Sequence, residues 1–219
     1  MYENETNIKC TIKCFLAEWS SLSKTLPVYG GSFYIRWGRK TCPPTSTIVY
    51  RGQMTGPSWL SVGGGPNWQC LPEDPEYNTN TPRASNSFLR AAHYRTGGSV
   101  QDHRIPCTVC ETMQRVSQLM IPGKTRCPTS EWTLEYRGYM VSSAETESHS
   151  EDFKTSNYYR GNYVCVDERP ESLTSSSYGR VGPQLYYVSA ACGDKVSGAL
   201  NNCPPYKHAN ALSCVVCSK

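Results

Sequence analysis

The sequence predicts a mainly β, disulfide-rich single domain that is built from two pseudo-repeats and preceded by a short N-terminal helix. Three observations predict this fold class. The 219 residues include 12 cysteines, 15 tyrosines, 17 glycines and 15 prolines but only 18% charged residues, a composition typical of loop-rich extracellular β-proteins. Apolar and polar residues alternate in short segments from residue 29 onward. Four motifs occur twice, in the same order, and each holds a cysteine or a glycine.

The alternating segments are rich in β-branched and aromatic residues, which favour strands. We expect strands over residues 32–37, 46–50, 131–136, 184–188 and 212–216. A short helix is the expectation near 87–92. The polar stretches 77–87 and 141–157 are interpreted as long loops, which in compact domains tend to be functional or mobile.

Residues 1–28 differ from the rest and predict a helical oligomerisation segment before a β domain over 29–219. Apolar residues recur there at alternating spacings of four and three, which is a helix seam: Ile8, Ile12, Phe15, Trp19, Leu22 and Leu26. Residues 8–14 also alternate as a strand would, but the longer periodic run favours the helix. In a helix, Cys10 and Cys14 share one face and could link neighbouring chains. The alternatives are a local bridge or an amphipathic helix that packs on its own domain.

The duplication defines repeat one as about 33–110 and repeat two as about 118–217. The motif pairs are Gly38–Pro43 with Gly123–Pro128, Tyr50–Met54 with Tyr136–Met140, Asn67–Glu76 with Asn162–Glu171, and Cys107–Cys110 with Cys214–Cys217. Each repeat therefore contributes four equivalent cysteines. No linker separates the repeats, so we expect one domain with pseudo-twofold character.

Ten cysteines are predicted to form disulfides: Cys42, Cys70, Cys107, Cys110, Cys127, Cys165, Cys192, Cys203, Cys214 and Cys217. If the repeated Cys-x-Val-Cys motifs are strands, their two cysteines point to opposite faces. Each motif should then bridge to the two earlier cysteines of its repeat, in either order. Cys192 and Cys203 would close a short loop, which stabilises a fold by about 2–4 kcal/mol.

This cysteine density points to an oxidising compartment and a secreted, extracellular protein. The net charge of +4 is mild and no long basic tract occurs, so nucleic acid is not expected as a partner. No apolar run is long enough to span a membrane. No apolar leader follows Met1, so we interpret the chain as a mature or trimmed form. Asn4 lies in the one N-glycosylation sequon.

A family likeness rests on several of these motifs. Residues Tyr34–Arg39 with Cys42-Pro43, Cys70–Pro75, Ile105–Cys110, and the ending Cys203–Tyr206 with Ser213–Lys219 resemble the C-terminal non-collagenous domain of sponge short-chain collagens and related secreted domains of marine invertebrates. The resemblance covers about 33–219. It implies a matrix or adhesive context and no catalytic residues. The chain departs from that family because it has no Gly-X-Y tract.

Metal and catalytic chemistry receive little support from the sequence. The two Cys-x-Val-Cys motifs are better explained by disulfides than by zinc. No signature of a nucleophile elbow or phosphate loop occurs, and we expect no enzyme. Calcium is the one cofactor left open, because oxygen ligands on loops suit it; its candidate ligands are Glu73, Asp74, Glu76, Asp167, Glu168 and Glu171. A structural alternative pairs Glu73 and Glu168 with Arg51 and Arg137.

Aromatic rings beside loops suggest glycan stacking, since flat apolar rings match the C–H faces of sugars. Trp59, Tyr158 and Tyr159 are the ligand candidates. Trp68 and Tyr163 occupy equivalent positions beside cysteines and are predicted to fill the core.

These observations favour a non-catalytic secreted structural or adhesive module that self-associates as a homo-oligomer, with a trimer as one arrangement. Its partners would be the extracellular matrix or glycans. The alternative is a secreted lectin-like protein that recognises glycans. A concave cleft lined by loop aromatics would favour the lectin, and an apolar patch would favour assembly.

Overall fold

A computed structural model describes residues 30–58, 67–78, 82, 87–143, 162–173, 182–193, 199–201 and 203–219. Residues Gly31–Lys219 form one compact unit. The expectations for the N-terminal helix, Cys10, Cys14 and Asn4 lie outside the described residues.

The described chain is mainly β, as predicted. Its strands are β1 (Gly31–Trp37), β2 (Ser46–Gly56), β3 (Gln69–Pro72), β4 (Arg90–Ala91), β5 (His93–Tyr94), β6 (Pro106–Met113), β7 (Gln118–Pro122), β8 (Thr133–Ser142), β9 (Val164–Asp167), β10 (Gln184–Tyr187) and β11 (Ser213–Ser218). A 3₁₀ turn, η1, covers Gly98–Val100. Each predicted strand segment lies in or overlaps one of these strands.

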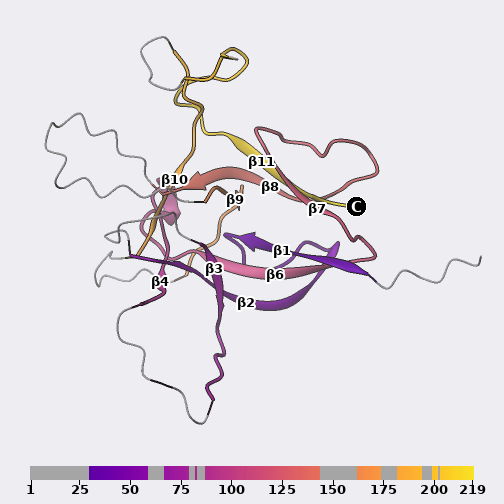
Figure 1. The fold of residues 1–219 in the computed structure, drawn as a ribbon, viewed down its shortest axis with the longest axis vertical. Coiled ribbons are helices and arrows are strands. Elements are labelled where there is room, and N and C mark those ends of the chain that lie inside the picture. Colours follow the sequence, from indigo (N-terminus) through magenta and orange to yellow (C-terminus); the bar gives the residue numbers. More distant parts are fainter. Residues whose placement is uncertain are drawn as a thin grey trace, which may run out of the picture. The chain divides into compact units, whose positions relative to one another are not determined.

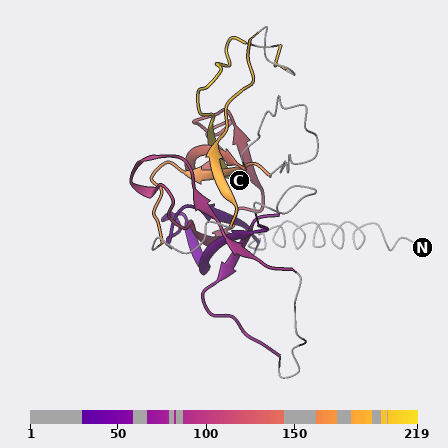
Figure 2. The same cartoon turned by 90° about the vertical axis from the view of Figure 1, so that its left-hand side faces the viewer.

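Eight of these eleven strands form two antiparallel groups of four. In the first, the order is β3-β2-β6-β1, and in the second it is β9-β8-β11-β7. Figures 1 and 2 show β1, β2 and β6 lying together and β7, β8 and β11 lying together. The groups meet where Trp37 of β1 pairs in parallel with Val166 of β9.

Five disulfides join all ten cysteines expected to be paired. The first cysteine of each set of four bonds to the fourth, and the second bonds to the third: Cys42–Cys110 and Cys70–Cys107, then Cys127–Cys217 and Cys165–Cys214. The fifth bond joins Cys192 to Cys203. Each Cys-x-Val-Cys strand therefore carries one bridge on each of its faces.

The repeated tyrosine performs the same contact in both strand groups. The Tyr50 hydroxyl donates to the backbone carbonyl of Cys70 at 3.1 Å. The Tyr136 hydroxyl donates to the carbonyl of Cys165 at 2.9 Å. Each ring therefore fixes a short strand to the long strand beside it.

The repeated glycine lets those same strands approach closely. A Cβ built on Gly52 would overlap the carbonyl oxygen of Leu71, and one built on Gly138 would overlap that of Val166. Any side chain there would force the paired strands apart. The glycine of each Tyr-Arg-Gly motif is therefore required for β2 to lie close to β3 and for β8 to lie close to β9.

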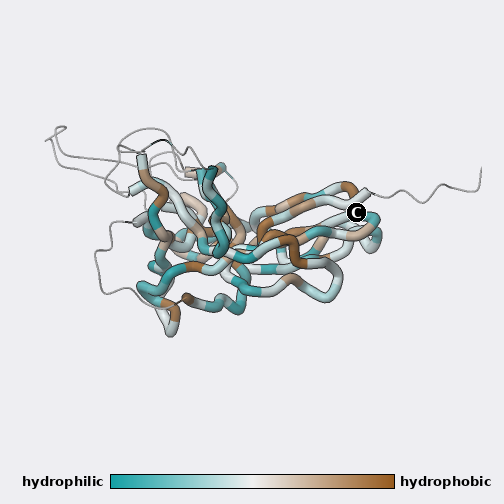
Figure 3. The backbone as a smooth tube through the Cα atoms, turned by 90° about the horizontal axis from the view of Figure 1, so that it is seen from below, coloured by the Kyte–Doolittle hydropathy of each residue, from teal (hydrophilic) through white to brown (hydrophobic). Residues whose placement is uncertain are grey.

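Two cores lie on these groups. One gathers around Trp37, Met54, Trp68 and the Cys70–Cys107 bridge. The other gathers around residues of both groups, among them Tyr34, Tyr136, Met140 and the Cys165–Cys214 bridge. Figure 3 shows hydrophobic and hydrophilic stretches interspersed along the described backbone.

The helix expected near 87–92 is wrong. Residues Arg90–Ala91 form β4, where Thr55 pairs with Ala91, and the next amide, of Ala92, donates to the Met54 carbonyl at 2.8 Å. Short-range propensity favoured a helix, but the edge of β2 offers partners for these backbone groups.

Candidate functional site

The first three calcium candidates are exposed. Glu73, Asp74 and Glu76 follow β3 on the surface. Arg51 does not pair with Glu73 in the described part of the chain; its Nε donates instead to the Lys40 carbonyl at 2.9 Å. The expected ion pair is therefore wrong, because the arginine is used within its own strand group.

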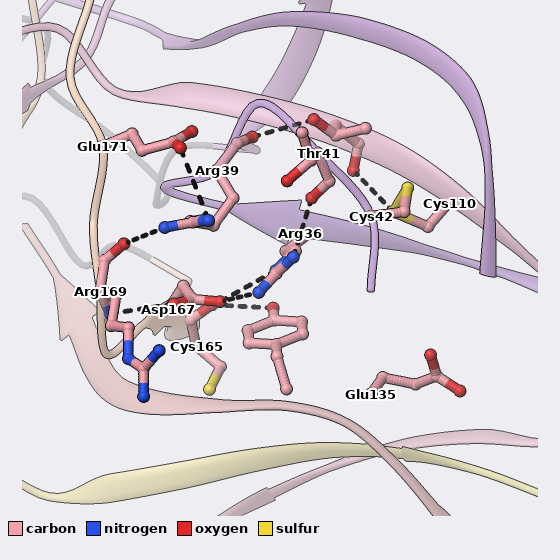
Figure 4. Close-up of polar contacts among 12 residues, drawn as sticks. Arg36, Arg39, Thr41, Cys42, Cys110, Glu135, Cys165, Asp167, Arg169 and Glu171 are labelled. Atoms are coloured by element: carbon pink, nitrogen blue, oxygen red, sulfur yellow. Dashed lines mark hydrogen bonds and ion pairs between the residues drawn. A yellow bond between two sulfur atoms is a disulfide. The ribbon is translucent and has the colours of Figure 1, made fainter. Parts of the chain in front are cut away.

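Asp167, a calcium candidate of the second set, is buried and engaged by an arginine. Arg36 donates to Asp167 Oδ2 from Nε at 2.9 Å and from Nη2 at 2.6 Å. The other oxygen accepts the amide of Arg169 at 2.9 Å. Figure 4 shows this pair between the two strand groups. Asp167 is thus occupied in joining β1 to β9, beside the Trp37–Val166 contact.

Glu171 holds the turn after β1 in place. Its carboxylate accepts the amide of Lys40 at 2.7 Å and faces Arg39 Nη2 at 3.5 Å. Its amide donates to the Gly38 carbonyl at 2.7 Å, and its carbonyl accepts the Tyr94 hydroxyl at 2.8 Å. Glu168, the last candidate, is exposed. Among the described residues, no group of three metal-ligating side chains is found.

Glu135 is a buried carboxylate that the sequence did not single out. Its two oxygens accept five side-chain hydrogen bonds, from Tyr34 at 2.9 Å, Thr45 at 2.9 Å, Ser46 at 2.7 Å, Ser218 at 2.5 Å and Arg115 at 3.1 Å. Burial raises the pKa of Glu135, but the hydrogen bonds from Ser218, Ser46, Thr45 and Tyr34 outweigh it and hold the pKa below its ordinary value. The donors come from both strand groups, so this carboxylate is a second tie between them.

An apolar groove of about 320 Å³ lies among β1, β7 and β9. Its lining includes Phe33 and Ile35 of β1, Met120 of β7, and Tyr163 just before β9. Phe33 is 58% exposed and Tyr163 is 56% exposed, so both rings are available to a partner. Tyr136 lines the groove and donates to the Ile35 carbonyl at 3.2 Å.

Trp68 and Tyr163, the two aromatic residues expected in the core, have different surroundings. Trp68 is 5% exposed, as predicted, and its Nε1 donates to the Asn162 carbonyl at 2.9 Å. The expectation for Tyr163 is wrong, because its side chain lines the groove. Equivalent positions in the sequence therefore have different surroundings, which only the packing of the two strand groups decides. The ligand candidates Trp59, Tyr158 and Tyr159 lie outside the described residues.

Exposed apolar side chains continue from the groove along the segment that links β6 to β7. Met113 and Val116 are each 60% exposed and Leu119 is 43% exposed. Met113 pairs with Gly31, so it lies on the same face as Phe33. We define these three residues and Phe33 as the apolar rim.

No protein-family model matches the chain. Within the described ranges, no helix is long and apolar enough to cross a membrane. The five disulfides are compatible with an extracellular protein.

Proposed function

We propose that this chain is a secreted, non-catalytic structural or adhesive module that self-associates through the groove and the apolar rim. The groove with its exposed rings carries the proposal. Contiguous apolar surface of this kind marks interaction sites on soluble proteins. A second copy of the chain is the proposed occupant.

Unpaired strand edges support the same surface. Among the described residues, β7 pairs only with β11, and β1 pairs with a second strand only at Trp37, although its Ile35 carbonyl also accepts the Tyr136 hydroxyl. Free edges present backbone donors and acceptors to another chain. Apolar side chains beside free edges favour an association in which strand pairing and burial of Phe33 and Tyr163 occur together.

The two pseudo-repeats are part of this proposal. The order of pairing in the two strand groups, the first-to-fourth and second-to-third disulfides, and the two equivalent Tyr-to-Cys hydrogen bonds support a duplicated four-strand unit. A duplicated unit accounts for the disulfide-linked architecture. Each unit contains two disulfides, and Asp167 and Glu135 link the two units.

The test is the assembly state of the full chain, measured by native mass spectrometry and analytical ultracentrifugation. We expect a concentration-dependent oligomer that Phe33→Ser weakens. Phe33 exposes on the order of 100 Å² of apolar ring, whose burial contributes about 2 kcal/mol per contact. The dissociation constant should therefore rise roughly 30-fold.

Phe88→Ser is the matched control, since Phe88 is 59% exposed outside the groove. Equal effects of the two substitutions, or a wild-type protein that stays monomeric at high concentration, would refute association through this surface. Repeating the measurement with reductant separates a bridge between chains through Cys10 or Cys14 from non-covalent assembly.

The lectin-like alternative rests on Tyr163, whose exposed ring lines a concave site. It predicts that neutral glycans bind and that Tyr163→Ser abolishes binding, while Tyr77→Ser, at an 80% exposed tyrosine outside the groove, does not. A glycan array without hits would count against this alternative and leave the assembly test unaffected.

A further inference from the structure

A second depression lies at the opposite end of β7 from the apolar rim. It has a volume of about 690 Å³ and is formed by the turn after β7 and by the segment that leads into β11. The Gly123 amide donates to the Ser213 carbonyl at 2.7 Å, which closes the base of the cleft. Gly123 has a φ of 70°, and a Cβ built there would lie 3.3 Å from the Tyr206 hydroxyl. Glycine thus permits both the turn and the approach of the ring.

The charge of this cleft is entirely positive. Lys124 and Lys207 line it and are exposed. Neither residues 117–130 nor residues 199–219 contain an aspartate or a glutamate. The next acid along the chain, Glu131, pairs with Lys219. A cleft lined by charge of one sign concentrates the field and attracts anions.

A neighbouring depression extends the charged surface. It has a volume of about 390 Å³ and shares Lys124 and Thr125 with the first. Arg126 lines it and is exposed. Lys207, Lys124 and Arg126 therefore follow one another across two adjoining hollows. A track of this kind suits a polymer with repeated negative charges better than a single small anion.

The uncharged lining suits a sugar chain. Tyr206 and Pro205 give an apolar wall on which pyranose C–H faces can stack. Thr125 and Asn210 offer side-chain donors and acceptors to hydroxyl groups. A few polar groups set in an apolar wall are typical of ligand sites.

We propose that these two depressions form a binding site for an anionic polysaccharide, with sulfate groups contacting the lysines and sugar rings packing on Tyr206. The site shares no residue with the association surface, so either proposal can fail alone. Function in an adhesive matrix would then combine self-association at one end of β7 with polysaccharide capture at the other.

The test uses the full chain and heparin as the probe, with desulfated heparin and neutral dextran for comparison, in calorimetry and on an affinity column. We expect binding to heparin that weakens steeply as salt rises and is lost with dextran. The variant Lys124→Gln/Lys207→Gln should bind heparin at least about tenfold more weakly at low salt. Lys40→Gln/Arg137→Gln removes the same charge from exposed positions outside the cleft and should change affinity by less than about twofold.

Tyr206→Ala tests the shape of the cleft without altering its charge. It should weaken heparin binding severalfold, while an intact mass equal to that calculated for the disulfide-bonded variant and an unchanged circular dichroism spectrum show that the fold and its disulfides persist. Equal losses in the two charge variants, or full binding by Tyr206→Ala, would overturn the site in favour of diffuse attraction by net charge. Binding of polyglutamate but not heparin would also overturn it.

Discussion

Replacing Glu135 with glutamine tests whether a buried carboxylate ties the two strand groups together. The side chain is inaccessible to solvent and accepts five hydrogen bonds. A glutamine keeps one acceptor oxygen and introduces a donor in place of the other. If its oxygen faces Tyr34, Thr45 and Ser46, its amide nitrogen faces Arg115, which has no acceptor.

The expected loss follows from these contacts. Arg115 keeps its bonds to the Thr45 carbonyl and the Ser218 hydroxyl, but among the described residues it loses the carboxylate with which it forms an ion pair. Breaking a buried charge pair by removing one member typically costs 3–5 kcal/mol. Because Arg115 is 22% exposed, water compensates in part, and we expect about 3 kcal/mol. With a urea m-value of about 2 kcal/mol/M, the unfolding midpoint should fall by about 1.5 M.

The pH dependence gives an independent check. The pKa of Glu135 in the folded protein lies below its ordinary value of 4.5. The carboxylate therefore stabilises the fold fully above pH 4.5, and this contribution is lost as the pH falls through the folded pKa. The stability difference between wild type and Glu135→Gln should be largest near neutral pH and shrink below pH 4.5.

The assay is urea unfolding of the disulfide-intact protein, followed by tryptophan fluorescence at several pH values. Glu131→Gln is the control, because Glu131 is an exposed carboxylate four residues earlier, and it should leave the midpoint nearly unchanged. A loss below about 0.5 kcal/mol, or a difference that does not change with pH, would refute the reasoning.

Two further predictions concern the stability of the disulfide-linked fold. Gly138→Ala should destabilise the fold by about 3 kcal/mol or more, since its Cβ would overlap the Val166 carbonyl oxygen; native yield and urea midpoint measure this, and a wild-type midpoint would contradict the proposed close approach. Removing the Cys192–Cys203 bridge, which closes a separation of 11 residues, should cost about 3 kcal/mol, less than losing any of the four bonds that close longer loops. Thermal unfolding of paired Cys→Ser variants gives this ranking, and an inverted order would show that strain, not loop length, sets the contribution of each bond.

The repeated motifs allowed eight of the ten paired cysteines to be predicted, but not the contacts of the Tyr-Arg-Gly motif. The Tyr50 hydroxyl reaches the Cys70 carbonyl, and the backbone of Leu71 passes close to Gly52, about 20 residues away along the chain. Alternation predicted β1, β2, β8, β10 and β11. The strand β7 was not predicted. Gln118–Pro122 is short and half-exposed, and it was interpreted as the connection between the two repeats.

The groove could not be predicted for a different reason. Trp68 and Tyr163 are equivalent in the sequence, yet one ring is buried and the other is exposed. Their surroundings depend on which face of one strand group packs on the other. The roles of Asp167 and Glu171 could not be predicted for the same reason. The sequence motif suggested that they bind calcium, whereas the structure shows Asp167 bonded to Arg36 and Glu171 bonded to the amide of Lys40, both from a distant part of the chain.

Neighbours along the chain are enough to specify the β-rich class, the cysteines to be paired, the spacing shared by the two members of each motif pair, and the positive character of the segments around Lys124 and Lys207. Other features depend on contacts between segments that are distant in the sequence. These are the order of the disulfides, the burial of Glu135, and the exposure of Tyr163 in the groove. Alternation along a strand fixes the face of the sheet on which each side chain lies. The surface that packs against this face depends on how the two strand groups bury their apolar side chains against each other.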